Sequence, residues 1–170
     1  MSGSWQITTR SERELAVAHW LLSAATLRAF AVDEWKTGGV TALQCGTLFA
    51  AVRIPAAVVH AAAGTEVLSE VDEYLRGAVH GGPVIYGANG QQYYALVPAS
   101  IQRTWTVPGT AVVGRGDYLG VPSPDLVRYP GRAGSYWSVP MDSPAVLCTQ
   151  GAVSQLALTG RYRMAAAAAS

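Results

Sequence analysis

The sequence has few charged residues for its size. Charged side chains make up 14% of its 170 residues, whereas hydrophobic ones make up 50%. This composition excludes an intrinsically disordered chain, because such chains are rich in charge and poor in apolar residues. The formal net charge of +1 also gives no overall attraction to nucleic acid. We therefore expect a single globular domain with a sizeable core.

Cysteine is scarce as well. The two cysteines, Cys45 and Cys148, are isolated and far apart in the sequence. Their spacing excludes a C-x-x-C metal or redox motif and a disulfide framework. The sequence therefore predicts two buried free thiols.

No hydrophobic run is long enough to cross a membrane. The most apolar stretch, residues 52–63, is interrupted by Arg53, Pro55 and His60 and is shorter than the ~20 residues of a membrane span. The first residues show no basic region followed by an apolar core, so we expect no secretory signal. These features predict a cytoplasmic protein that does not bind a membrane.

The charge that is present is unevenly distributed. Residues 1–97 hold six Lys or Arg against eight Asp or Glu, whereas residues 98–170 hold six against three. A locally basic surface of this kind can face phosphates. The alternative is an ordinary solvated surface.

Helical patterns occur in both halves of the chain. Ser11 and Glu14 match a capping box and precede apolar residues at helical spacing, which predicts a helix over 12–30. Pro55 suits the first turn of a helix, and Thr65 suits a helix cap. Together with an apolar run near the carboxyl end, these signals predict helices over 56–63, 66–76 and 152–158.

Short apolar runs bounded by glycine or proline predict strands. They are residues 40–43, 47–54, 84–86, 93–97, 111–113, 118–121 and 136–139. The last two runs are expected to form a β-hairpin with a long loop. The order of elements predicts an α+β fold, with a mixed or antiparallel β-sheet flanked by helices. We assign this domain to residues 1–163, followed by an alanine-rich tail, 164–170, whose composition is compatible with disorder.

Two glycine-containing stretches resemble a known family. Gly114-Arg115-Gly116-Asp117-Tyr118 leads to Pro122-Ser123-Pro124, and Gly134-Ser135-Tyr136-Trp137 follows. They resemble motifs of the primase-polymerase domain of the archaeo-eukaryotic primase superfamily. The similarity extends over about residues 33–139 and is greatest to short, degenerate members found in actinobacteria. It implies a primase-polymerase-like fold.

The resemblance also bears on catalysis. Primase-polymerases hold two divalent cations with three carboxylates. The positions that match those carboxylates here are Val52, Ile54 and Ala111, and none of these side chains can bind a metal. The resemblance therefore implies a catalytically silent domain with no metal and no cofactor.

A further family motif contains a histidine that contacts nucleotide phosphate. The similar stretch runs from Tyr86 to Leu96, and Gln92 occupies the histidine position. Glutamine forms hydrogen bonds but carries no positive charge. The alternative for this stretch is an ordinary Asn-Gly hairpin turn between two strands.

A silent domain of this type is expected to bind single-stranded nucleic acid or a nucleotide. Aromatic rings would stack on bases, at ~1–3 kcal/mol each, and arginines would contact phosphates. The candidate residues are Gln92, Tyr94, Arg115, Tyr118, Arg128, Arg132, Tyr136 and Trp137. The alternative is that the aromatic side chains point inward and form the core.

Two other functions remain open. The low charge content favours exposed apolar patches and hence a protein-interaction or assembly role, for example as a homo-oligomer. An active nucleotidyltransferase would need other acids, such as Asp33, Glu34, Asp117 or Asp125. Their spacing gives no reason for these four residues to converge.

Overall fold

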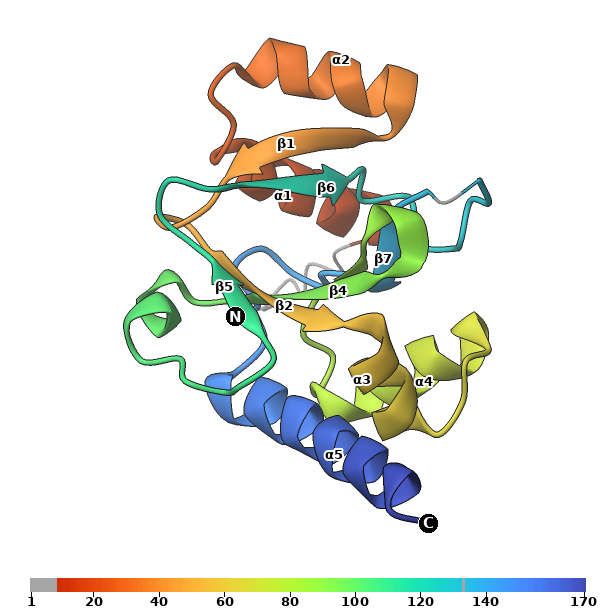
Figure 1. Ribbon diagram of the computed structural model, residues 1–170. Coiled ribbons are helices and arrows are strands. Elements are labelled where there is room, and N and C mark those ends of the chain that lie inside the picture. Colours follow the sequence, from red (N-terminus) through yellow and green to blue (C-terminus); the bar gives the residue numbers. More distant parts are fainter. Residues whose placement is uncertain (1–8, 133) are drawn as a thin grey trace, which may run out of the picture.

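The computed structural model describes residues 9–132 and 134–170 (Figure 1). The chain forms a five-stranded sheet and a separate two-stranded sheet, with all strand pairs antiparallel, so the predicted α+β class is confirmed. The helices are α1 (Arg10–Leu22), α2 (Arg28–Gly38), α3 (Ala56–Ala63), α4 (Leu68–Ala78) and α5 (Gln150–Ala168). The strands are β1 (Val40–Gln44), β2 (Ala50–Pro55), β3 (Val84–Tyr86), β4 (Gln92–Val97), β5 (Ala111–Val113), β6 (Tyr118–Pro122) and β7 (Tyr136–Val139), and two short 3₁₀ turns, η1 (Ala88–Gly90) and η2 (Ala99–Arg103), flank β4.

The five-stranded sheet, in the order β5-β2-β4-β3-β7, is covered on both faces. Side chains of a strand alternate between faces, so Tyr93, Ala95 and Val97 of β4 pack toward α3, α4 and α5. Leu96 of the same strand packs with α1, β1 and β6 on the other face. The two resulting cores account for most of the large apolar residues of the chain.

The two-stranded sheet contradicts the predicted hairpin. Strand β6 pairs with β1, from Val40 opposite Pro122 to Gln44 opposite Tyr118. Strand β7 pairs with β3 at the edge of the five-stranded sheet. The prediction was wrong because β1 and β3, both distant in sequence, pair with these strands in place of their neighbours. Helix α2 covers β1 and β6, where the Trp35 Nε1 donates to the Val121 carbonyl (Figure 1).

The predicted helix over 12–30 is in fact two helices. The capping box uses Thr9 and Glu12, two residues earlier than the expected Ser11 and Glu14. The chain leaves the helix after Leu22, and the Ala24 carbonyl accepts a hydrogen bond from the Gln44 amide of β1. That long-range contact ends α1, and α2 starts at Arg28.

Helix boundaries elsewhere agree in part with the sequence. Helix α3 has the predicted bounds, whereas α4 begins at Leu68 because Thr65 caps a turn and accepts from the Val67 amide. The alanine-rich tail is helical as far as Ala168, because α5 continues through it. Both cysteines are free and buried, as predicted, and desolvation by burial raises the pKa of each thiol to about 12. None of the helices in the described ranges has the length and hydropathy needed to span a bilayer.

Helix α5 packs closely on α3 at Gly160. A Cβ atom at this position would overlap the Val58 carbonyl oxygen and lie 2.7 Å from the Val58 Cγ1. Gly151, in the first turn of the same helix, has open space around it. The two glycines therefore separate the effect of packing from that of helix propensity.

We predict that Gly160→Ala lowers the free energy of unfolding by about 1–3 kcal/mol, because the helices must move apart. Gly151→Ala is the matched control, and we expect it to leave stability unchanged or to raise it by up to about 1 kcal/mol. Urea unfolding followed by circular dichroism measures both. A Gly160→Ala protein as stable as the parent would show that α5 does not pack on α3 in this way.

Candidate ligand-binding clefts

A cleft of about 740 Å³ lies between the two sheets. We call it the inter-sheet cleft. Its walls come from β1 and β6 on one side and from β2, β4 and β5 on the other, and residues before β7 close one end. The polar and aromatic side chains that line it are Arg53, Tyr94, Asp117, Tyr118 and Ser135.

A hydrogen-bonded turn fixes the shape of this cleft. The Gln102 side chain donates through Nε2 to the Gly46 carbonyl at 3.2 Å and accepts the Arg115 amide at 2.8 Å. A Cβ atom on Gly46 would collide with the Arg115 backbone, and one on Gly114 would lie 2.6 Å from the Gln102 Oε1. The glycines around this turn are therefore required by close packing.

The two tyrosines of the cleft differ in exposure. Tyr118, at the start of β6, is 57% exposed. Tyr94 of β4 is half-buried, and a Cβ atom on Gly87 would lie 2.8 Å from its ring, so the ring lies against the Gly87 backbone. The cleft thus presents one fixed and one exposed aromatic ring to any molecule that enters it.

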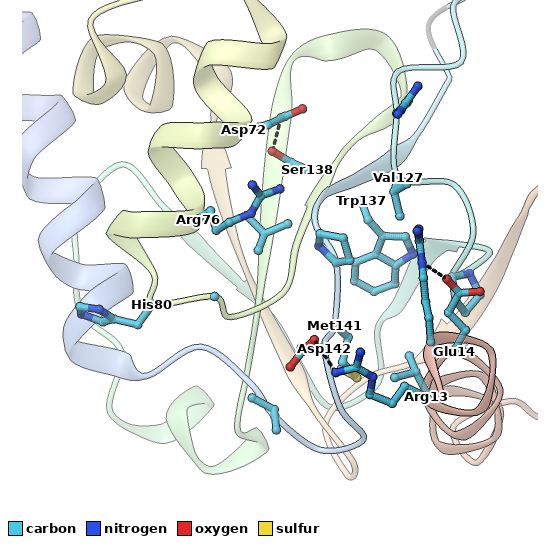
Figure 2. Close-up of a pocket in the computed structure, with 18 residues that line it drawn as sticks. Arg13, Glu14, Asp72, Arg76, His80, Val127, Trp137, Ser138, Met141 and Asp142 are labelled. Carbon is cyan, nitrogen blue, oxygen red and sulfur yellow. Dashed lines mark hydrogen bonds and ion pairs between the residues drawn. The ribbon is translucent and has the colours of Figure 1, made fainter. Parts of the chain in front are cut away.

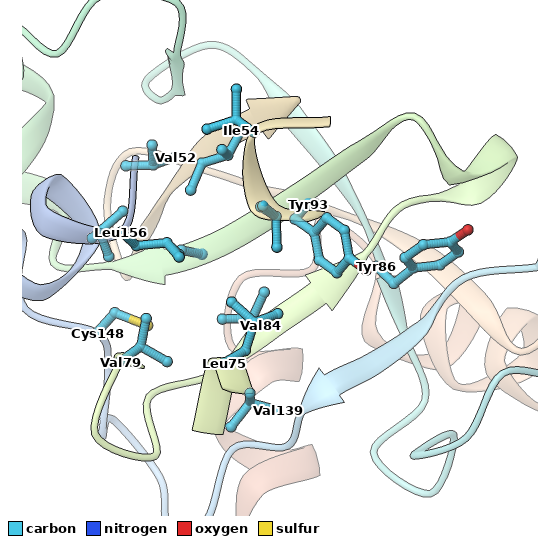
Figure 3. Packing of buried hydrophobic residues seen from close by; sticks show 14 of the residues in the cluster. Val52, Ile54, Leu75, Val79, Val84, Tyr86, Tyr93, Val139, Cys148 and Leu156 are labelled. Atoms are coloured by element: carbon cyan, nitrogen blue, oxygen red, sulfur yellow. The ribbon is translucent and has the colours of Figure 1, made fainter. Parts of the chain in front are cut away.

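The three positions that match the metal carboxylates of primase-polymerases do not converge. Ala111 lines the inter-sheet cleft opposite Arg53. Val52 and Ile54 are 0% and 1% exposed and pack in the core beneath α3 and α5 (Figure 3). Alternation along β2 is the physical reason, since Arg53 between them takes the cleft face.

Gln92 does not line the cleft either. It begins β4 opposite Pro55, and its Oε1 is buried without a hydrogen-bond partner in the described structure. The stretch before it is an Asn-Gly hairpin, as the alternative for this motif proposed. Asn89 and Gly90 have φ angles of +76° and +69°, and β3 pairs directly with β4.

The remaining candidates lie apart from the inter-sheet cleft. Tyr136 and Trp137 of β7 are 0% and 1% exposed, so the core alternative holds for both. Arg132 lies in the loop before β7, has a φ of +52°, and lines neither of the cavities described here. Arg115 is exposed on the turn that Gln102 holds. Arg128 lines a second cavity, which is drawn in Figure 2.

A half-buried polar cluster lies beside that second cavity. The Asp72 carboxylate of α4 accepts hydrogen bonds from the Tyr136 hydroxyl at 2.8 and 2.9 Å and from the Ser138 hydroxyl at 2.5 Å. Ser138 is the extra residue of a bulge between β3 and β7. Desolvation by burial raises the pKa of Asp72, although the two hydroxyl groups and the Arg76 charge act in the opposite direction.

The acids proposed for an active enzyme lie on three segments: Asp33 and Glu34 on α2, Asp117 just before β6, and Asp125 after β6. Asp117 lines the inter-sheet cleft, and its Oδ2 accepts the Gly114 amide at 3.0 Å. Glu34 of α2 accepts the Thr41 hydroxyl at 2.7 Å. Over residues 9–132 and 134–170, no three His, Cys, Asp or Glu side chains form a group that could hold a metal ion.

Sequence reasoning missed Arg53, Arg10, Arg13 and Arg76, which line the two cavities. Arg53 interrupts an apolar strand, and this was the one available signal that it faces outward. Arg10 and Arg13 lie one turn apart on α1, whereas Arg76 comes from α4, and no spacing in the sequence connects the two helices.

No protein-family model matches this sequence, and no curated protein or solved structure matches it. The resemblance to primase-polymerases therefore stays a prediction from the residues quoted above.

The Asp72 cluster predicts a pH dependence of stability. Because the folded pKa of Asp72 is raised, its contribution to stability is complete below the unfolded pKa of about 3.9 and is lost as the pH rises through the folded pKa. The free energy of unfolding of the parent, minus that of Asp72→Asn, should therefore fall as the pH rises from about 4 toward neutrality. Urea unfolding across this range measures the difference, and a difference that grows with pH would contradict the raised pKa.

Proposed function

We propose that this chain binds a nucleotide or single-stranded nucleic acid in the inter-sheet cleft and acts without nucleotidyl transfer. The observation that carries the proposal is the presence of Tyr94, Tyr118 and Arg53 on the walls of one cleft. Two rings and a guanidinium are the groups that a base and a phosphate require.

The exposed ring of Tyr118 supplies the first contact. A base stacked on it would cover apolar surface that is now 57% exposed, at a gain of ~1–3 kcal/mol. Tyr94 is held against Gly87, so its ring loses little conformational freedom on binding. The volume of about 740 Å³ suits a ligand of nucleotide size.

Charge in the cleft favours few phosphate contacts. Arg53 is the one cation among the lining residues, and Asp117 is the one carboxylate. Asp117 accepts the Gly114 amide. Arg53 forms no ion pair with a carboxylate in the described part of the chain, so its guanidinium can contact a phosphate. Three acids are needed to hold two divalent ions in the resembled family, and Asp117 alone does not replace them. Stacking, rather than metal-assisted chemistry, is therefore the proposed mode of action.

A titration with a fluorescein-labelled single-stranded oligonucleotide tests the proposal. Tyr118→Ala should weaken binding by about 5- to 150-fold, the equivalent of one stacked base. Arg53→Gln should lower the slope of log K against log salt by about 0.7, since it removes one phosphate contact. A nucleoside triphosphate used as competitor shows whether one nucleotide fills the cleft.

Tyr162→Ala is the matched control, because Tyr162 is 76% exposed on α5 and does not line the cleft. It should bind like the parent. Equal affinities of the parent, Tyr118→Ala and Arg53→Gln would reject the inter-sheet cleft as the site. Primer extension in the presence of Mn²⁺ that is abolished by Asp117→Ala would reject the silent role.

A protein-interaction or assembly role is the second candidate. It is favoured by three large apolar side chains on the α1–α2 segment, Leu15, Leu27 and Phe30, which are 60%, 68% and 61% exposed. An interface requires such side chains to form one contiguous apolar patch.

Under this second candidate, the chain forms a homodimer that Leu27→Ser and Phe30→Ser weaken at least about tenfold, since each removes a large apolar contact. Sedimentation velocity over a range of protein concentrations measures the association. Tyr162→Ser, equally exposed but on α5, should associate like the parent. A parent that stays monomeric at all concentrations removes the dimer.

A further inference from the structure

The second cavity has a different composition from the inter-sheet cleft. It encloses about 650 Å³ between α1, α4, β7 and the segment that follows β6. We call it the arginine cavity, because Arg10, Arg13, Arg76 and Arg128 line it from three separate parts of the chain. Figure 2 shows Arg76 on the α4 side and Arg13 and Glu14 on the α1 side, with Trp137 between them.

Part of its lining is apolar. Val17, Trp137, Val139 and Met141 are all less than 8% exposed and contribute to the lining. The Trp137 indole is fixed, since its Nε1 donates to the Pro122 carbonyl at 3.0 Å. A rigid apolar wall of this kind provides the favourable burial that an apolar ligand body needs.

The carboxylates that line the cavity already form ion pairs or hydrogen bonds within the protein. Glu14 pairs with Arg10 at 3.0 Å, and Asp142 pairs with Arg13 at 3.9 Å. Asp72 accepts the Tyr136 and Ser138 hydroxyl groups. These carboxylates therefore already have donors within the protein.

Two arginines of the cavity, Arg76 and Arg128, differ from Arg10 and Arg13. Arg76 and Arg128 are exposed, line the cavity from α4 and from the segment after β6, and have no ion pair in the described part of the chain. Arg76 interacts electrostatically with the Asp72 carboxylate, but at a distance longer than that of an ion pair. A guanidinium presents several donors in a planar fork, which matches a carboxylate, phosphate or sulfonate group.

We propose that the arginine cavity binds a small amphipathic organic anion. Its apolar body would lie against Trp137, Val17 and Met141, and its anionic group would be held by Arg76 and Arg128. The enclosed volume of about 650 Å³ is within the range of small-molecule sites and is too small for a folded partner. This site is separate from the inter-sheet cleft and does not depend on the function proposed for that cleft.

The experiment uses 8-anilinonaphthalene-1-sulfonate, which joins an aromatic body to one anionic group and fluoresces when it enters an apolar site. Arg76→Gln and Arg128→Gln should each raise its Kd by about tenfold, because each removes a charge-assisted contact. Arg103→Gln removes the same charge from η2, outside the cavity, and should bind like the parent. Near-ultraviolet circular dichroism and Tm establish that each variant is folded.

Four results would overturn the proposal. Equal probe affinity in the parent, Arg76→Gln and Arg128→Gln would show that the arginines do not hold the anion. Loss of binding in Tyr118→Ala alone would place the probe in the inter-sheet cleft. If uncharged 1-anilinonaphthalene binds as tightly as the sulfonate, the cavity recognises only the apolar body. If equimolar sulfate displaces the probe, the cavity recognises only the anionic group.

Discussion

The central five-stranded sheet is covered on both faces, and the rest of the structure depends on this constraint. Its short strands supply side chains to two cores at once, so β2, β3 and β4 are almost entirely apolar. A sheet of this kind needs two covering layers, and the chain makes the second from α1 and the β1–β6 pair. Helix α2 then covers β1 and β6 in turn. The high proportion of apolar residues is thus largely explained by the number of internal layers, although ten large apolar side chains of the described residues remain exposed.

Both cavities arise where the covering layers meet the edges of this sheet. The inter-sheet cleft lies where β1 and β6 diverge from β2 and β5, and the arginine cavity lies where α1 and α4 approach the edge strand β7. The Gln102 contacts to Gly46 and Arg115 fix the first of these boundaries. The glycines that resembled a catalytic motif have local structural explanations: Gly114 lies against the Gln102 side chain, and Gly116 has a φ of +91°.

Local signals predicted the elements well and their partners poorly. Strands β3, β5 and β7 and helix α3 have the predicted bounds, because glycine and proline delimit them. The split between α1 and α2 depends on the Ala24 to Gln44 hydrogen bond, and the position of β6 depends on β1. Such contacts join residues that local periodicity does not relate. For the same reason, the sequence identified Tyr94 and Tyr118 as candidates but not Arg53 or Arg76, whose importance comes from the neighbours that the fold gives them.

The segment that joins β6 to β7 contributes to both cavities. Pro124, Val127 and Arg128 line the arginine cavity, whereas Gly134 and Ser135 line the inter-sheet cleft. It is anchored between them by the Trp137 amide, which donates to the Leu126 carbonyl at 2.8 Å. A ligand in one cavity would immobilise one end of the β6–β7 segment. A second ligand, in the other cavity, would then lose less conformational entropy when it immobilises the other end. Occupancy of the two cavities would then be thermodynamically linked, and reciprocity requires each ligand to change the affinity of the other by the same factor.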